Sequence, residues 1–238
     1  MLKTSVFLMK EYTQKIHSYL GRHKDTEAAK SMSKATKWEK KFLGIKSTDL
    51  KNIFKAVFTA YPLPKNEDTK SIIRELFSLE EREYLYFGIE LFAKRRKLWN
   101  KTDIVFVESL ILTQPGWDTT EYISTKLVSH FYEMFPKVTL EFLESWSASK
   151  SPWLKATAIM FQRKMKDKTD KEILGRFISE NLGTNDEIVN RAIGSALRDY
   201  SKSNHEWVLE NVVTNSEKMN KKTKQEAIKW IDSKGLIK

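Results

Sequence analysis

A tryptophan and a glutamate four residues apart, Trp117 and Glu121, are the residues of this sequence whose types and spacing could do chemistry. They follow the Pro115-Gly116 dipeptide, which ends one apolar segment and precedes a predicted helix. Residues four apart lie on one face of a helix, so the ring and the carboxylate would face outward together. That pair suits a positively charged ligand, because the ring face attracts cations and the carboxylate supplies the opposite charge.

Structural roles would explain the same two residues without any chemistry. Asp118 suits the N-cap of the helix, and Glu121, three residues later, would complete a capping box. Trp117 would equally serve as a packing residue, because tryptophans are strongly buried on average. No other catalytic or metal-binding motif competes, since the four histidines are scattered: His17, His23, His130 and His205. We therefore expect neither a metal ion nor a cofactor.

The overall charge points to a polyanionic partner. The chain has 42 Lys and Arg against 31 Asp and Glu, a formal net charge of +11. Such a surplus favours nucleic acid before a membrane surface. The absence of cysteine excludes disulfides and thiolate metal sites and fits a reducing compartment. No stretch is long enough to span a membrane or to act as a signal peptide, so we expect a cytoplasmic monomer that does not bind membranes.

Helical periodicity dominates the chain. Glycine and proline are few, at eight and five, and apolar residues mostly recur at spacings of three and four. The sequence therefore predicts an all-α fold, with helices over residues 3–20, 25–41, 48–60, 69–78, 84–94, 103–112, a segment opening behind Trp117, 139–147, 153–163, 171–181, 188–198, 206–213 and 221–233.

A repeat of about 35 residues begins near residue 69. Residues 84–94 align with residues 153–163, which lie 69 positions later, and these align with residues 188–198 after another 35. Repeated helical hairpins of this length predict an α-solenoid, in which each unit buries its apolar face on its neighbours. We expect one domain over residues 1–238, with basic N-terminal helices over 1–60 and repeats over 69–238.

Basic residues recur in two patterns that would suit phosphate binding. Lys94, Arg163 and Arg198 each end one of the aligned segments, so in a solenoid they would line one concave, basic surface. Basic residues near helix C-termini are also favoured simply by the helix dipole. The second pattern is a stripe on the predicted 25–41 helix, which we expect either to face phosphates or to be solvated: Lys30, Lys34, Lys37 and Lys41.

Several motifs, taken in order, resemble the AlkD-type DNA alkylation repair family of HEAT-like-repeat alkylpurine DNA glycosylases. They extend over about residues 10–235: Phe42-Leu43-Gly44-Ile45, Ile72-Ile73-Arg74-Glu75-Leu76, Glu80-Glu81-Arg82-Glu83, Trp117-Asp118, Ala192-Ile193-Gly194 and Leu197-Arg198-Asp199-Tyr200. The resemblance implies a right-handed α-solenoid of HEAT-like repeats whose concave surface grips duplex DNA. It also implies excision of purines that carry a positive charge from N3 or N7 alkylation. In that pattern Trp117 matches an active-site tryptophan, and Glu121 falls where the family has a catalytic aspartate.

Three further positions depart from the family pattern. Ser195 replaces a second active-site tryptophan, Ala156 replaces a DNA-contacting arginine, and Ile188 replaces another aromatic residue at the same cleft. Trp153 shares the register of Ile188 and would also line the cleft. We expect basic residues at the same helix starts to replace the lost arginine in part: Lys155 and Arg191.

The function expected from these observations is recognition of alkylated purines in damaged duplex DNA, with hydrolysis of the N-glycosidic bond. Glu121 would stabilise the developing positive charge and orient the water, while Trp117 would contact the nucleoside. One alternative is a non-catalytic relative that binds branched or distorted DNA. Another is a HEAT-type scaffold for an acidic protein partner.

Overall fold

The protein is all-α, as a computed structural model of the chain shows over residues 2–36 and 40–236. Within these ranges the β-structure is one isolated bridge, between Lys41 and Glu81. The chain divides into two compact units, Met1–Asn100 and Lys101–Lys238. The predicted fold class is thereby confirmed, while the single-domain organisation stays a prediction.

The first unit is built from helices whose apolar faces meet in one core. Helices α4 and α5 pack on each other as a hairpin, and α1 packs against α3 and α4. Fully buried side chains from these elements include Ile16, Ile73 and Phe87. The elements are α1 (Leu2–Gly21), α2 (Thr26–Ala35), α3 (Ser47–Ala60), α4 (Asn66–Phe77), α5 (Arg82–Lys94) and a short 3-10 turn, η1 (Arg96–Leu98).

A buried carboxylate holds the loop between α2 and α3. Glu83 is 1% exposed and accepts the backbone N–H groups of Leu43 at 2.9 Å, Gly44 at 3.0 Å and Ile45 at 3.2 Å. Gly44 has φ +89°, and a Cβ there would lie 2.0 Å from the carbonyl oxygen of Asp25. The loop therefore needs glycine at this position and a carboxylate beneath it.

Helix α2 is shorter than the sequence predicts. Asp25 caps it as expected, accepting N–H groups at 2.9 and 3.1 Å. The helix ends at Ala35, because Thr36 is extended and its hydroxyl donates to the Ser33 carbonyl at 2.9 Å, a bond that competes with helical ones. The prediction of one lysine face up to Lys41 is therefore wrong.

The lysines of that predicted stripe have different surroundings. Lys30 is exposed and pairs with Glu27 at 2.8 Å. Lys41 lies beyond α2 and pairs with Glu80 at 2.5 Å, a contact that raises the pKa of Lys41 through the hydrogen bond and charge of Glu80. Lys34 is exposed, and Lys37 lies outside the described residues.

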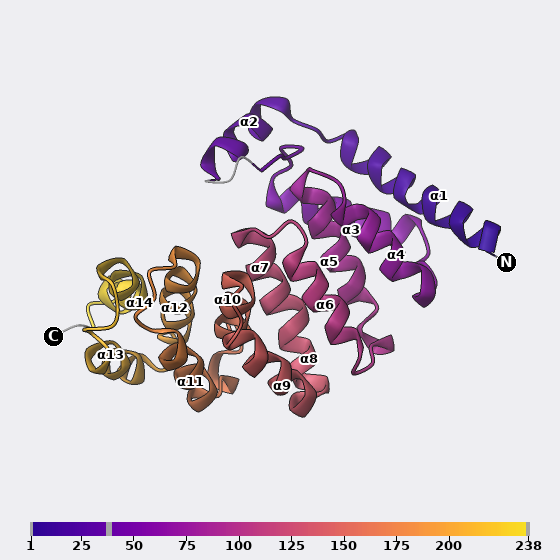
Figure 1. The fold of residues 1–238 in the computed structure, drawn as a ribbon. Helices are drawn as coiled ribbons and strands as arrows, with labels where there is room; N and C mark the ends of the chain where they lie inside the picture. The colour runs from indigo at the N-terminus through magenta and orange to yellow at the C-terminus, as the bar shows by residue number, and fades with distance from the viewer. Residues whose placement is uncertain (1, 37–39, 237–238) are drawn as a thin grey trace. The chain divides into compact units, whose positions relative to one another are not determined.

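The second unit consists of stacked helical pairs. Helices α7, α10, α12 and α14 pack in succession, and α9, α11 and α13 flank them (Figure 1). This arrangement confirms the predicted helical repeats. The elements are α6 (Asp103–Leu112), α7 (Trp117–Ile123), a π-helix η2 (Ser124–Val128), α8 (Ser129–Met134), α9 (Pro136–Ser147), α10 (Pro152–Met160), a 3-10 turn η3 (Lys166–Lys168), α11 (Lys171–Asn181), α12 (Glu187–Tyr200), α13 (His205–Thr214) and α14 (Lys221–Ser233).

A glycine allows α12 and α14 to approach closely. A Cβ at Gly194 would lie 3.0 Å from the Cβ of Glu226 and 3.2 Å from the carbonyl oxygen of Thr223. A larger residue would push the two helices apart, because both neighbours belong to the body of α14. Glu226 is thereby brought against α12.

Candidate functional site

A group of charged residues gathers where α7, α10, α12 and α14 pack in the second unit. Three guanidinium groups come from the turn after α10 and from α12, and we call Arg163, Arg191 and Arg198 the arginine cluster. Around the cluster lie an aromatic ring and a carboxylate from α7 and a carboxylate from α14: Trp117, Glu121 and Glu226.

Glu121 forms an ion pair with Arg163. The distance from Arg163 Nη1 to Glu121 Oε1 is 3.2 Å, and the Arg163 side chain is only 8% exposed, against 31% for Glu121. Arg163 Nη1 also contacts the Met160 sulfur at 3.8 Å, while its Nε is buried with no hydrogen-bond partner among the described residues. The nearly buried guanidinium therefore fixes the direction of the carboxylate.

The predicted capping box at the start of α7 is wrong. The N-cap is Gly116, which offers no side-chain acceptor, and Asp118 already lies in the first helical turn. Glu121 pairs with Arg163 instead. A nearly buried guanidinium is costly without a carboxylate partner, whereas water can satisfy an N–H group at an exposed helix end. Glu121 therefore links α7 to the turn after α10.

Arg191 lies on the ring of Trp117. Its guanidinium carbon is 3.9 Å from the ring centroid, a cation–π distance. The residue as a whole is exposed and forms no hydrogen bond or ion pair with the described residues. Partial desolvation of the guanidinium lowers the pKa of Arg191, Glu121 and Glu226 raise it, and the two other arginines of the cluster lower it.

Arg198 pairs with Glu226 of α14, a residue that the sequence does not single out. Its neighbour Asp199 accepts the backbone N–H of Lys164 at 2.6 Å, which ties the turn after α10 to α12. Lys164 has φ +73° in that turn. The sequence hints at Glu226 only indirectly, through Gly194. A glycine inside a predicted helix can mark close contact with another helix, and Glu226 is a residue that Gly194 contacts.

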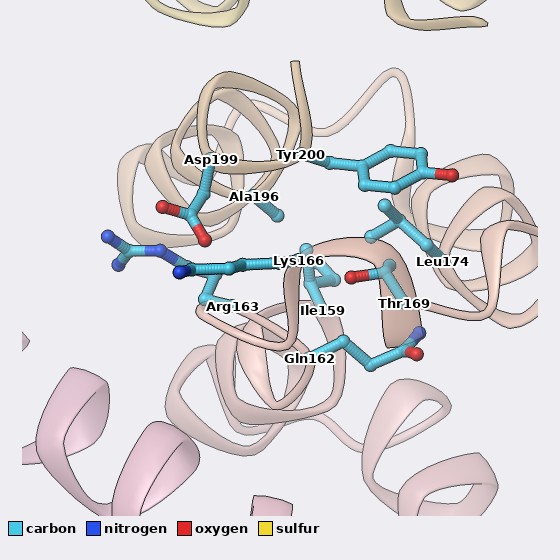
Figure 2. Close-up of a pocket in the computed structure, with 9 residues that line it drawn as sticks. All are labelled: Ile159, Gln162, Arg163, Lys166, Thr169, Leu174, Ala196, Asp199 and Tyr200. Atoms are coloured by element: carbon cyan, nitrogen blue, oxygen red, sulfur yellow. The ribbon is translucent and has the colours of Figure 1, made fainter. Parts of the chain in front are cut away.

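The cavity beside the cluster is too small for a nucleobase. Its volume is about 10 Å³, room for one water molecule. Figure 2 shows Arg163 and Asp199 on one side of it and Tyr200 and Leu174 on the other. This cavity therefore has no room for a nucleotide.

A π-helix follows α7 directly. Over Ser124–Val128 the backbone adopts π-type turns, and the hydroxyls of Ser124 and Thr125 donate to the carbonyls of Thr120 at 2.6 Å and Glu121 at 2.9 Å. Such insertions are frequent at functional sites. Here the π-helix begins three residues after Glu121.

The remaining predicted cleft residues lie on the same helices as the cluster. Trp153 and Lys155 are partly exposed at the start of α10, and Ile188 is partly exposed at the start of α12. Ser195 is only 5% exposed inside α12, and Ala156 is fully buried in α10. Roles for these residues in binding stay predictions.

Lys94 belongs to the first unit. It is exposed at the end of α5, with its Nζ 5.5 Å from the centroid of the Phe58 ring. Over the described residues, no group of three or more His, Asp and Glu side chains is arranged to hold a metal ion. In the same part of the chain, none of the helices combines the length and apolarity of a membrane span.

Comparison with solved structures shows the same fold in an enterococcal protein and in a streptococcal protein. A predicted DNA alkylation repair enzyme from Enterococcus faecalis is 22% identical with a TM-score of 0.77, covering 87% of this chain and 96% of that one. AlkD2 from Streptococcus mutans is 17% identical with a TM-score of 0.60, covering 85% and 97%. Comparison with curated proteins gives no significant match.

The sequence itself gives the family. Residues 16–231 match the family described as DNA alkylation repair enzyme, which is most of the chain. The all-α repeat fold agrees with that match. The chain therefore belongs to the DNA alkylation repair enzyme family.

Proposed function

We propose that this protein binds damaged duplex DNA through the arginine cluster and hydrolyses the N-glycosidic bond of a positively charged alkylated purine. Family membership supports a role in DNA alkylation repair. The observation that carries the finer proposal is the Glu121 carboxylate, oriented by Arg163 and one helical turn from the Trp117 ring. These are the groups that such a reaction needs.

The reaction asks little of the protein, because an alkylated purine is already a cationic leaving group. No general acid has to protonate it. The protein must stabilise the oxocarbenium-like sugar and orient one water molecule, and a single fixed carboxylate, Glu121, would serve both purposes. Arg198, whose side chain is 33% exposed, would contact a flanking phosphate with the guanidinium nitrogens that Glu226 leaves free. The nearly buried Arg163 would hold Glu121 in place.

A second candidate is binding of branched or distorted DNA without excision. Two observations favour it. Both members of the α7 pair already contact arginines of the protein, and the buried Ser195 gives no second aromatic wall. A missing stacking platform would cost about 1–3 kcal/mol of base binding.

Release of 7-methylguanine or 3-methyladenine from methylated duplex DNA distinguishes these candidates. We expect slow release by the protein and at least a roughly hundredfold loss in Glu121→Gln, which keeps the shape but removes the charge. Glu144→Gln is the matched control, because Glu144 pairs with Arg176 on α9 and α11 at 2.8 Å. It should release base at the normal rate.

Each negative result has its own meaning. If the protein binds duplex DNA but releases no base at high concentration, the excision proposal fails and the second candidate stands. If neither duplex nor branched DNA is bound at low salt, both fail, and a scaffold for an acidic protein partner remains.

A further inference from the structure

A cavity in the first unit is large enough for a small molecule. Its volume is about 220 Å³, against about 10 Å³ for the cavity beside the arginine cluster. A cavity of about 150 Å³ can hold a benzene molecule, so this one has room for a single six-membered ring with a small head group. The lining comes from α1, from the loop between α3 and α4 and from α4 itself, and we call this cavity the α1–α4 pocket.

The walls of the α1–α4 pocket suit a planar ring. Two tyrosines and two prolines line it: Tyr12, Tyr61, Pro62 and Pro64. Tyr12 is 8% exposed and its hydroxyl is buried, so a ligand would contact its ring. Another ring can pack on these apolar surfaces without breaking any hydrogen bond of the protein. An aromatic ligand therefore fits this pocket better than a polar one.

Contacts within the protein hold the walls in place. Lys15 Nζ lies 4.7 Å from the centroid of the Tyr61 ring, and the Tyr19 ring meets Tyr61 edge-on with centroids 5.9 Å apart. The Thr69 hydroxyl donates to the Lys65 carbonyl at 2.9 Å, which fixes the loop against the start of α4. A site that is already ordered loses little conformational entropy when a ligand binds.

The charges that line the α1–α4 pocket leave one cation without a carboxylate partner. Glu11 and Lys15 pair with each other at 2.7 Å. Asp68 is only 8% exposed and has an interaction within the protein. Lys65 is exposed and forms no ion pair with the described residues. The group that is available to a ligand is therefore a cation, which favours an anion.

We propose that the α1–α4 pocket binds a small aromatic anion, a single ring that carries a carboxylate or a phosphate. The ring packs against Tyr12 and Tyr61, and the anionic group pairs with Lys65. All these residues belong to the first unit, whereas the arginine cluster belongs to the second. The inference therefore goes beyond the proposed function and does not depend on it.

Binding of 4-fluorobenzoate to the full chain, followed by fluorine NMR, tests the inference. We expect saturable binding at millimolar concentration. The uncharged 4-fluorobenzamide has nearly the same shape and should bind about threefold more weakly, because it forms no ion pair with Lys65. Competition by benzoate and by phenyl phosphate then shows whether the natural ligand is a carboxylate or a phosphate.

Two variants locate the binding site. Lys65→Gln should weaken binding of 4-fluorobenzoate by about threefold and leave binding of 4-fluorobenzamide unchanged. Leu63→Trp should weaken binding of both probes by at least about tenfold, since Leu63 lines the pocket and an indole would occupy the space of the ligand. Lys51→Gln is the matched control, because it removes the same charge from an exposed lysine of α3 outside the pocket.

Either of two results would overturn the inference. Equal affinities for the two probes would show that the pocket does not select an anion. Unchanged binding in Leu63→Trp, with its fold verified by circular dichroism, would show that the probe binds elsewhere. Lys65→Gln changes an exposed side chain, so it tests the inference even if Leu63→Trp does not fold. Base release from methylated DNA is a separate measurement, and a failure here leaves the proposed function standing.

Discussion

The ion pair between Glu121 and Arg163 joins the candidate site to the stability of the second unit. Arg163 is 8% exposed, so removing Glu121 leaves a nearly buried guanidinium without a carboxylate. We expect Glu121→Ala to lower the free energy of unfolding by about 1–3 kcal/mol, measured by urea denaturation. The double variant Glu121→Ala/Arg163→Met should recover much of that loss, because an apolar side chain of similar length needs no partner.

An equal stability of Glu121→Ala and the natural protein would contradict this account. It would mean that solvent already satisfies Arg163, despite its low exposure. The excision assay would then be free of any folding effect, and the loss of base release in Glu121→Gln could be read as chemistry alone.

Residue types and spacing indicate which residues lie at this site, but not which of them form ion pairs with one another. Trp117 and Glu121 stand out from one helix, and Arg163 and Arg198 from the repeat register. Their pairing depends on which helices pack together, and local spacing contains no such information. For that reason the spacing suggests a capping box as the structural role of Glu121, and it gives no indication of Glu226 as a partner of Arg198.

Two buried tyrosines, one on α1 and one packed against it, should make the stability of the first unit sensitive to alkaline pH. Tyr12 lies on α1, and Tyr84 of α5 packs against His17 of α1 with ring centroids 4.5 Å apart. Burial raises the pKa of both phenols to about 12. Between pH 10 and 12 the unfolded chain loses these protons while the folded chain keeps them, so stability falls as pH rises.

We expect a loss of about 2–3 kcal/mol for each tyrosine by pH 12, measured as urea unfolding at increasing pH. Tyr12→Phe should remove its own share of that loss. It should leave stability at pH 7 unchanged or slightly higher, because the Tyr12 hydroxyl has no hydrogen-bond partner among the described residues. An alkaline loss of full size in Tyr12→Phe would overturn the prediction.

At the scale of elements, apolar periodicity predicts most helices, because burial of one face determines where they form. The predicted 103–112, 171–181 and 221–233 helices have those same bounds in the structure. Two departures from regular α-helix involve hydroxyl side chains. Thr36 ends α2 early, and Ser124 and Thr125 bond to backbone carbonyls in the π-helix, and neither effect changes the apolar pattern.

At the scale of the whole molecule, the repeat period predicts the stacking of helical pairs in the second unit. It does so because each pair can bury its apolar face only on its neighbours. The departures within the repeats, such as Gly194, determine how closely two helices approach. The concave basic face expected from the charge stays a prediction, and DNA binding itself can test it.

The net charge of +11 predicts that the affinity for DNA decreases as the salt concentration rises. Each phosphate neutralised by a lysine or arginine releases counterions, so log Kd changes linearly with log salt concentration. Lys34 is exposed and has no carboxylate partner among the described residues, unlike Lys30, which pairs with Glu27. If Lys34 contacts a phosphate, Lys34→Ala should reduce the slope by about 1 and weaken every duplex by a similar factor.

Lys171→Ala is the control, because this exposed lysine begins α11 in the flanking row of the second unit. It should leave the slope unchanged. An unchanged slope in Lys34→Ala would remove α2 from the DNA-binding surface. The excess positive charge of the N-terminal segment would then reflect solvation, since a phosphate contact cannot be lost without a change in the number of released counterions.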